Sequence, residues 1–345
     1  MDVLKKLVDA DGVSGSEEEV KEVIKAELEN YVDEIKEDKL GNLIVEKRGK
    51  MDGKRLMLAA HMDEVGLIVK YIDDNGFIRF TKVGGIDDSA LYNQRVRIKT
   101  PSQVYKGVIG VKSKHLGKKD EKTELFVDVG ASDRENVAEM GISAGCTITF
   151  DRKLVELSNE LVTGKALDDR AGCYVLIELL KSLENHRTNI YAVFTVQEEV
   201  GLRGAKVAAF RVHPDIAIAI DTTTAGDFPG IKPEECPVKI GLGPCIKIAD
   251  GRKDSLGGGI ITHPAVRRLL IEAAQDGDIP YQIEVLEGGT TDAAAIHMTR
   301  EGIPSGVVSI PARYLHSSAE TLSIKDIKYT ISLLEYAIKR IELGM

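Results

Sequence analysis

The sequence predicts an α/β protein in which an all-β, barrel-like domain is inserted into an α/β domain. Two observations predict it. First, short apolar, β-branched runs recur far apart in the chain, and each ends at or near an acid or a histidine. They are RLMLAA before His61, IYAVFTVQ before Glu198, IAIAI before Asp221 and VVSIP before His316. Second, the stretch from Leu67 to Arg152 contains short strand-like runs separated by Gly, Asp, Asn and Pro, such as LIVKYI, FIRFTKV, RVRIKT and VYKGVIGV.

The order of these elements predicts two domains. Ser16 and Glu19 form a capping-box pattern ahead of an amphipathic helix that reaches about Tyr31. The β-rich stretch lies between the His61 strand and Asp168, so we expect it to be inserted, with its two connections close together. The α/β domain then comprises residues 1–66 plus 153–345, and the inserted domain comprises residues 67–152.

After the insertion, strands and helices alternate again. Helices are predicted at about 169 to 183, 264 to 275 and 292 to 301. Thr262 is the expected cap of the second, with Pro264 in its first turn; Asp292 is expected to cap the third and Gly302 to end it. The last helix has one apolar face, which comprises Ile324, Ile327, Ile331, Leu334, Ile338 and Ile341.

The composition limits the classes of binding partner and the cellular compartment that we expect. A net charge of −9, with both signs interspersed and no basic stripe, argues against nucleic acid and anionic membrane. No apolar run approaches the roughly 20 residues that span a bilayer, and the start lacks a signal-peptide pattern. The four cysteines show no CxxC spacing, which fits a reducing cytoplasm.

The acids and histidines that follow the apolar runs are expected to meet, because ligands gather at the carboxyl ends of parallel strands. His61 can bind a metal while Asp63, two residues on, holds its other ring nitrogen. In GKALDDRAG, helix capping explains one aspartate, whereas the carboxylate of Asp168 can also bridge two cations. Taken alone, each of these residues also fits a turn, cap or structural role.

The segment FTVQEEVGLRGA is more specific. Glu198 and Glu199 are adjacent acids after an apolar strand and repel each other unless cations or separate environments accommodate them. We expect Glu199 to bind metal and Glu198 to handle protons, although a pair of acids at a helix start is the ordinary alternative. Asp221 and His316 complete the set.

Six motifs, in this order along the chain, resemble those of the tetrahedral aminopeptidases, which are dimetal exopeptidases related to glutamyl and leucyl aminopeptidases. The motifs are HMDEVG, LDDRAG, QEEVGLRGA, AIDTT, GGTTDAAAI and IPARYLHSSAE. The resemblance covers nearly the whole chain, without a departure at the metal positions. It implies that His61 and Asp221 bind one metal, Glu199 and His316 the other, and that Asp168 bridges both. Asp63 would orient His61, and Glu198 would be the general base.

The resemblance also implies a phosphorylase/hydrolase-like αβα sandwich for the catalytic domain, and it implies the assembly and the substrate. The inserted domain would serve dimer formation, and dimers would build a tetrahedral dodecamer that acts on short peptides with a free N-terminus. The ligand chemistry of histidine and carboxylate favours two divalent ions, zinc or cobalt. Water made more acidic by the metal ions would then give its proton to Glu198 and attack the peptide carbonyl. The preferred N-terminal residue stays open.

Three other functions remain to be distinguished. A dimetal deacylase or carboxypeptidase would use the same ligands on another substrate. A glycosidase would use paired acids, although the chain has no Trp and its His and Asp spacing resembles a metal site. A scaffold protein would bind no metal.

Overall fold

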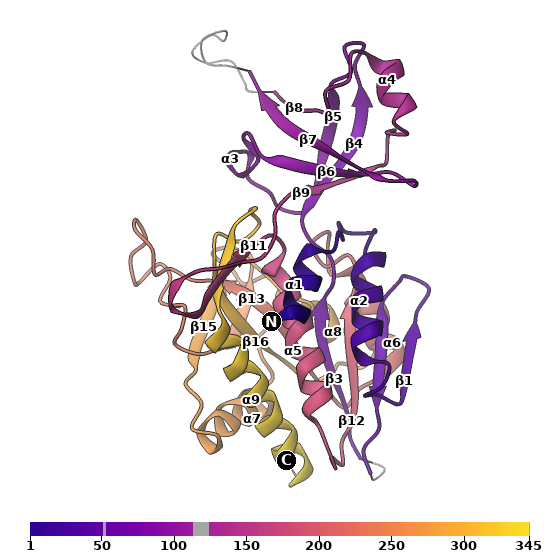
Figure 1. Cartoon of the computed structure of the whole chain (residues 1–345). Coiled ribbons are helices and arrows are strands. Elements are labelled where there is room, and N and C mark those ends of the chain that lie inside the picture. The colour runs from indigo at the N-terminus through magenta and orange to yellow at the C-terminus, as the bar shows by residue number, and fades with distance from the viewer. Residues whose placement is uncertain (51–52, 113–123, 345) are drawn as a thin grey trace.

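A large mixed sheet with helices on both faces forms the main body, and a smaller closed barrel stands at one end of it (Figure 1). The structure is a computed structural model that describes residues 1–50, 53–112 and 124–344. This arrangement confirms the predicted αβα fold with an inserted barrel.

The centre of the main sheet consists of parallel strands in the order β12, β3, β13, β16. Their bounds are β3 (Arg55–His61), β12 (Asn189–Thr195), β13 (Ile216–Thr224) and β16 (Ser305–Arg313). These are the apolar runs predicted from the sequence. Their side chains are buried on both faces, which is why each run is continuously apolar instead of alternating.

Further strands extend the sheet on both sides. On one side lie β2 and β1, and on the other β17, β11 and β10, while β14 and β15 continue from β16 along a second branch. Their bounds are β1 (Glu34–Glu37), β2 (Leu43–Lys47), β10 (Val155–Glu156), β11 (Leu161–Gly164), β14 (Cys245–Gly251), β15 (Gln282–Glu287) and β17 (Glu320–Ser323).

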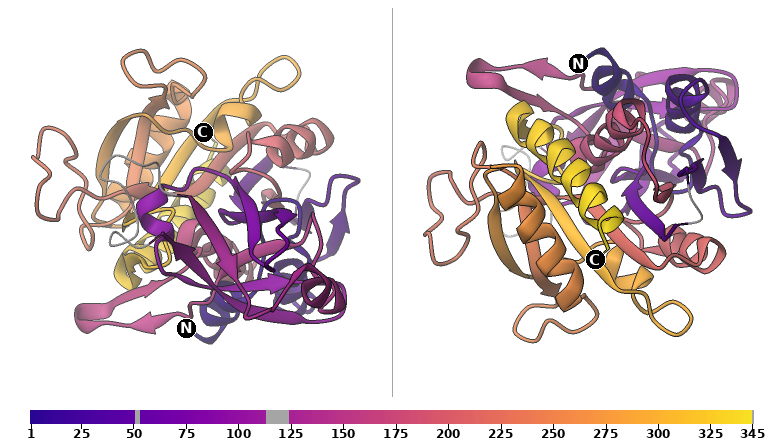
Figure 2. Two further views of the ribbon diagram at one scale, coloured as in Figure 1. Left: turned by 90° about the horizontal axis from the view of Figure 1, so that it is seen from above. Right: turned by 90° about the horizontal axis from the view of Figure 1, so that it is seen from below.

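Helices cover the two faces of the sheet unequally. One face packs against α1 (Asp2–Asp9), α2 (Glu18–Leu28), α5 (Leu167–Ser182), α7 (Pro264–Asp276) and α9 (Ile324–Glu342) in the largest core cluster. Seen from below, α7 and α9 lie side by side (Figure 2). The other face packs against α6 (Arg203–Val212) and the single turn α8 (Ala293–Ile296). The predicted apolar face of the last helix is confirmed, since Ile327, Leu334, Ile338 and Ile341 are buried.

The barrel closes in the order β4-β5-β8-β7-β6-β9 around its own apolar core. Its strands are β4 (Gly66–Ile72), β5 (Ile78–Val83), β6 (Arg95–Lys99), β7 (Val104–Val111), β8 (Leu125–Asp128) and β9 (Thr147–Phe150), with short helices α3 (Asp88–Leu91) and α4 (Arg134–Glu139) between them. Leu67 near the start of β4 pairs with Ile148 of the four-residue strand β9, and the two strands are antiparallel, so the start of β4 lies beside the end of β9. The two connections to the main body are therefore close together, as expected for an insertion.

Several helix starts differ from the prediction. Ser16 and Glu19 form no capping box: α2 begins at Glu18, and the Glu19 carboxylate accepts a hydrogen bond from the backbone N of Asp11. The α7 cap is the His263 ring and not Thr262, whose hydroxyl donates to the backbone O of Lys247. In both cases a side chain expected to take part in capping forms a hydrogen bond outside the helix instead.

The helix predicted at 292 to 301 is only the single turn α8, which ends at Ile296, well before Gly302. Asp292 precedes this turn but does not cap it, because its carboxylate accepts from the Thr195 hydroxyl at 2.5 Å. Helices α1 and α6 were not predicted. No described helix is long and apolar enough to cross a membrane, and the four cysteines are free.

Candidate metal centre and active site

The predicted site residues converge at the carboxyl edge of the parallel strands. His61 ends β3, Asp221 lies in β13, Glu198 and Glu199 follow β12, His316 follows β16, and Asp168 lies in the first turn of α5. The four strands are separated in sequence but adjacent in the sheet. A cavity of about 420 Å³ is lined by all six of the predicted metal-binding and proton-transfer residues, which are His61, Asp168, Glu198, Glu199, Asp221 and His316.

Asp168 lies between two groups of candidate ligands. Its Oδ1 is 3.3 Å from Nε2 of His61, and its Oδ2 is 3.4 Å from Nε2 of His316. His61 and Asp221 complete the first group, and Glu199 and His316 the second; within each group the ligand atoms all lie within 4.8 Å of one another. The arrangement is two adjacent sets of nitrogen and oxygen donors that share one carboxylate.

The start of α5 explains why this carboxylate is free. Asp168 and Asp169 have non-helical backbone dihedrals inside the first turn of α5. Asp169 Oδ1 accepts from the backbone N of Gly172 at 3.0 Å, which is the capping interaction expected of one of the two aspartates. Asp168 Oδ1 is buried and accepts no hydrogen bond from the described residues. A buried carboxylate oxygen without a donor fits a place for a cation.

Asp63 is fully buried behind the two glutamates. Its carboxylate accepts from the backbone N of Glu198 at 2.9 Å, from that of Glu199 at 3.1 Å and from the Ser14 hydroxyl at 2.6 Å. The Nδ1 of His61 lies closer to the backbone O of Asp63, at 3.1 Å, than to its Oδ1, at 3.6 Å. Asp63 thus fixes the backbone of both glutamates, a contact that the sequence did not predict.

Burial and mutual repulsion perturb the acids of the site. Burial raises the pKa of Glu198 and Asp221 well above the usual values, and it also raises the pKa of Glu199. Burial opposes the charge of Asp168 too, but the imidazoles of His316 and His61 hold its pKa far below the usual range. The carboxylates of Asp168 and Glu199 outweigh burial and raise the pKa of His316 to about 12. The cluster therefore favours added positive charge.

Two further polar residues at this edge were not singled out from the sequence. Glu320, which is 1% exposed, accepts from the backbone N of Asp168 at 2.9 Å and from that of His316 at 2.8 Å. Lys247 lines the cavity from β14, with its Nζ 3.5 Å from Oε2 of Glu284 on β15. Glu320 ends the HSSAE segment that follows the site histidine, which was the available signal. Lys247 has no sequence signal, because its partner comes from another strand.

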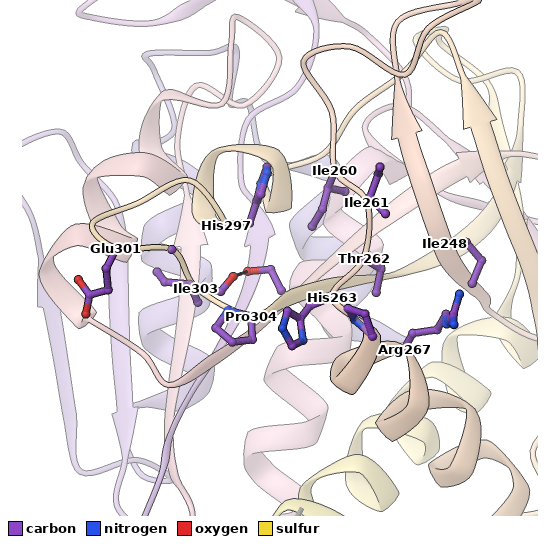
Figure 3. Close-up of a pocket in the computed structure, with 13 residues that line it drawn as sticks. Ile248, Ile260, Ile261, Thr262, His263, Arg267, His297, Glu301, Ile303 and Pro304 are labelled. Atoms are coloured by element: carbon purple, nitrogen blue, oxygen red, sulfur yellow. Dashed lines mark hydrogen bonds between the residues drawn. The ribbon is translucent and has the colours of Figure 1, made fainter.

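A second cavity, of about 490 Å³, lies elsewhere in the main body, between the start of α7 and the loop that follows α8 (Figure 3). Ile260, His263, Arg267, His297 and Ile303 contribute to its wall. It contains none of the predicted site residues, so the first cavity is the candidate active site.

Comparison with known proteins shows the family of the chain. The family model described as M42 glutamyl aminopeptidase matches residues 41–333. The lysyl aminopeptidase of Pyrococcus furiosus is 36% identical over 350 residues, which cover 99% of this chain and 97% of that protein.

Two solved structures are similar to this chain over nearly their full length. Aminopeptidase APDkam598 from the archaeon Desulfurococcus kamchatkensis is 42% identical, with a TM-score of 0.93 and coverage of 99% of this chain and 96% of that chain. The Pyrococcus horikoshii TET1 peptidase, described as able to assemble into a tetrahedron or a large octahedral shell, is 35% identical, with a TM-score of 0.84 and coverage of 97% and 98%. The chain therefore belongs to the M42 glutamyl aminopeptidase family and is a hydrolase that acts on peptide bonds.

Proposed function

We propose that this chain is a two-metal aminopeptidase that removes N-terminal residues from short peptides. The observation that carries the proposal is the position of Asp168, whose two carboxylate oxygens face the imidazoles of His61 and His316 at 3.3 Å and 3.4 Å. A single metal ion would be bound by only one of these two donor groups.

In the proposed site, His61 and Asp221 hold one divalent ion, Glu199 and His316 hold the other, and Asp168 bridges them. The donor set contains imidazole nitrogen and carboxylate oxygen without thiolate. This set favours zinc or cobalt over magnesium and calcium, which prefer ligand shells made wholly of oxygen.

Divalent ions bound here would acidify water and polarise the scissile carbonyl. Glu198 lines the same cavity but belongs to neither donor group, so its carboxylate is free to accept a proton. Burial raises its pKa, which suits a proton acceptor that must later release the proton. Glu198 would take a proton from the attacking water and pass it to the amine of the departing peptide. Asp63 holds the Glu198 backbone during both transfers.

Assembly and location form the second part of the proposal. The Pyrococcus horikoshii relative can assemble into a tetrahedron or a large octahedral shell. By analogy, this chain would form a tetrahedral dodecamer built from dimers, with the inserted domain, residues 67–152, at the dimer contact and residues 1–66 plus 153–345 carrying the chemistry. A cytoplasmic location fits its four free cysteines. Nucleic acid and membrane are not expected partners of a chain with a net charge of −9.

A panel of aminoacyl-arylamides, with matching N-acetylated compounds, tests the proposed activity. Release of the arylamine only from free-amine substrates, lost with a chelator and restored by zinc or cobalt, is the expected result. Cleavage of the blocked compounds would indicate a deacylase instead. Hydrolysis of a glucan that survives the chelator would indicate a glycosidase, and inactivity without metal binding would indicate a scaffold.

A further inference from the structure

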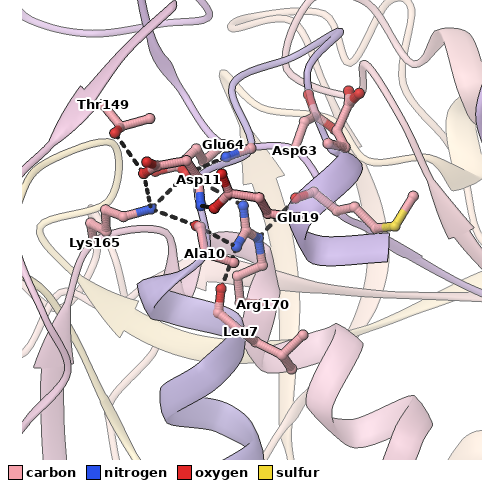
Figure 4. Close-up of polar contacts among 12 residues, drawn as sticks. Leu7, Ala10, Asp11, Glu19, Asp63, Glu64, Thr149, Lys165 and Arg170 are labelled. Atoms are coloured by element: carbon pink, nitrogen blue, oxygen red, sulfur yellow. Dashed lines mark hydrogen bonds and ion pairs between the residues drawn. The ribbon is translucent and has the colours of Figure 1, made fainter. Parts of the chain in front are cut away.

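A buried charge cluster lies behind the candidate metal centre (Figure 4). It consists of Asp11, Glu64, Lys165 and Arg170, which are 5%, 2%, 0% and 0% exposed. The formal charges of the two acids and the two bases sum to zero. Buried ion clusters add little stability over apolar packing of the same volume, because desolvation offsets the attraction between the charges. The effect of this cluster on the protein therefore depends on the backbone and side-chain groups that it contacts.

Arg170 connects two segments of the active site. Its Nε donates to the backbone O of Met62 at 2.8 Å, and Met62 stands between His61 and Asp63. Arg170 itself follows Asp168 by two residues in α5. One fully buried guanidinium thus joins the segment that presents His61 and Asp63 to the helix start that presents Asp168.

The same guanidinium also holds the N-terminal segment. Its Nη1 donates to the backbone O of Leu7 and, at 3.2 Å, to that of Ala10. The contact is close: a Cβ added at Gly12 would lie 2.5 Å from Arg170 Nη2. Only a planar group with several fixed donors can make all these contacts together.

Glu64 and Lys165 complete the connection. Glu64 Oε1 accepts from Lys165 Nζ at 2.6 Å and from the backbone N of Gly12 at 3.0 Å, and it lies 3.4 Å from Arg170 Nη2. Lys165 Nζ also donates to the backbone O of Ala10 at 2.9 Å. Lys165 precedes Asp168 by three residues, so the two buried cations lie on either side of Asp168 along the chain.

Asp11 extends the cluster to the barrel. Its Oδ1 accepts from the Thr149 hydroxyl of β9 at 2.7 Å and from Nη2 of Arg97 in β6 at 2.5 Å. The inserted domain and the site residues are therefore attached to the same N-terminal segment.

We propose that Arg170, Glu64 and Lys165 are positioning residues that set the separation between His61 and Asp168, and that Asp11 ties this arrangement to the barrel. They touch no substrate and act through the backbone of Met62 and the start of α5. The inference rests on the proposed function, because its consequence is the affinity of the two donor groups for metal.

Arg170→Lys is the most informative variant, because it keeps the charge but cannot donate to Met62, Leu7, Ala10 and Glu64 at once. Metal-free protein is titrated with zinc against a competing indicator, and circular dichroism establishes that the variant is folded. We expect the zinc dissociation constant to rise by about 10- to 100-fold, as for other residues that orient metal ligands. With zinc at saturation, kcat should fall while KM stays within about twofold of the wild type, since no substrate contact is removed.

Lys21→Met is the matched control. Lys21 is a lysine of α2 with 7% exposure whose Nζ lies 2.8 Å from Glu37 Oε1, so its loss also removes a buried cation from an ion pair. It should lower stability without weakening zinc binding. If Arg170→Lys does not fold, Glu64→Gln is measured in the same way, because Gln retains an acceptor for the Gly12 N–H.

Folded Arg170→Lys or Glu64→Gln protein that binds zinc within twofold of the wild type would overturn the inference. An equal loss of affinity in Lys21→Met would also overturn it, because general destabilisation would then suffice. A wild-type chain that binds no zinc, cobalt or manganese would instead refute the proposed function itself, which separates the two failures.

Discussion

Replacing Asp63 by Asn tests how the two active-site glutamates are held. Oδ1 and Oδ2 of Asp63 accept from the backbone N of Glu198 and of Glu199, respectively. Although burial opposes its charge, His61 and Ser14 hold the pKa of Asp63 below its usual value, so the wild-type group is an ionised double acceptor. Asparagine has the same shape but a single acceptor oxygen, and its amide nitrogen must face one of the two backbone N–H groups.

The expected magnitude follows from this count. One buried backbone N–H loses a charged acceptor, and a hydrogen bond to a charged group contributes about 1.5 to 3 kcal/mol. If about 2 to 3 kcal/mol of this is expressed in the transition state, kcat/KM falls by about 30- to 150-fold. The fall should appear mainly in kcat, because Asp63 is buried behind the site and contacts no substrate.

The assay is steady-state hydrolysis of the preferred aminoacyl-arylamide at saturating zinc or cobalt. Ser14→Ala is the matched control, because it removes one donor to the same carboxylate, at 2.6 Å, and leaves both backbone contacts in place. Its loss should stay below about tenfold. If Asp63→Asn retains kcat/KM within threefold of the wild type, or loses no more than Ser14→Ala, the reasoning is refuted.

Three further predictions follow, two from the site and one from Glu17, the buried residue that precedes α2. Glu198→Gln should lower kcat by about 10²- to 10⁴-fold with unchanged metal content, and retained turnover would remove Glu198 as the base. His316→Ala should lower the bound metal from two ions per chain to about one, measured by elemental analysis, and unchanged content would count against the ligand assignment. Burial raises the pKa of Glu17 from its usual 4.5 to about 7, so the native state holds this proton more tightly than the unfolded chain, and stability is lost as the pH rises through 7. Glu17→Gln, which keeps an acceptor for the Gly15 N–H, should therefore raise the free energy of unfolding by about 1 to 2 kcal/mol near pH 8 and by little near pH 4, and an equal effect at both pH values in denaturant titrations would contradict this.

The central strands and the convergence of the site residues were predictable because both depend on simple patterns. A strand buried on both faces is continuously apolar, and the carboxyl ends of parallel strands meet at one edge. Hence β3, β12, β13 and β16 were found from the sequence, together with the residues that end or follow them.

Several features that the sequence did not predict share one cause, which is that contacts between distant segments override local rules. Asp292 was expected to cap a helix, but it accepts from Thr195, which is 97 residues away. The Lys165–Glu64 pair joins residues 101 positions apart, so no local sequence pattern predicts the buried charge cluster. The second contact of Glu320, with the backbone N of Asp168, is 152 residues away and was equally hidden.

Anomalous diffraction shows whether one carboxylate, that of Asp168, joins two metal sites. Crystals of the chain grown with zinc are measured above and below the zinc absorption edge. The bridged arrangement requires two anomalous peaks per chain on either side of Asp168, one against His61 and Asp221 and the other against Glu199 and His316. A single peak per chain, or two peaks that do not share Asp168, would contradict it.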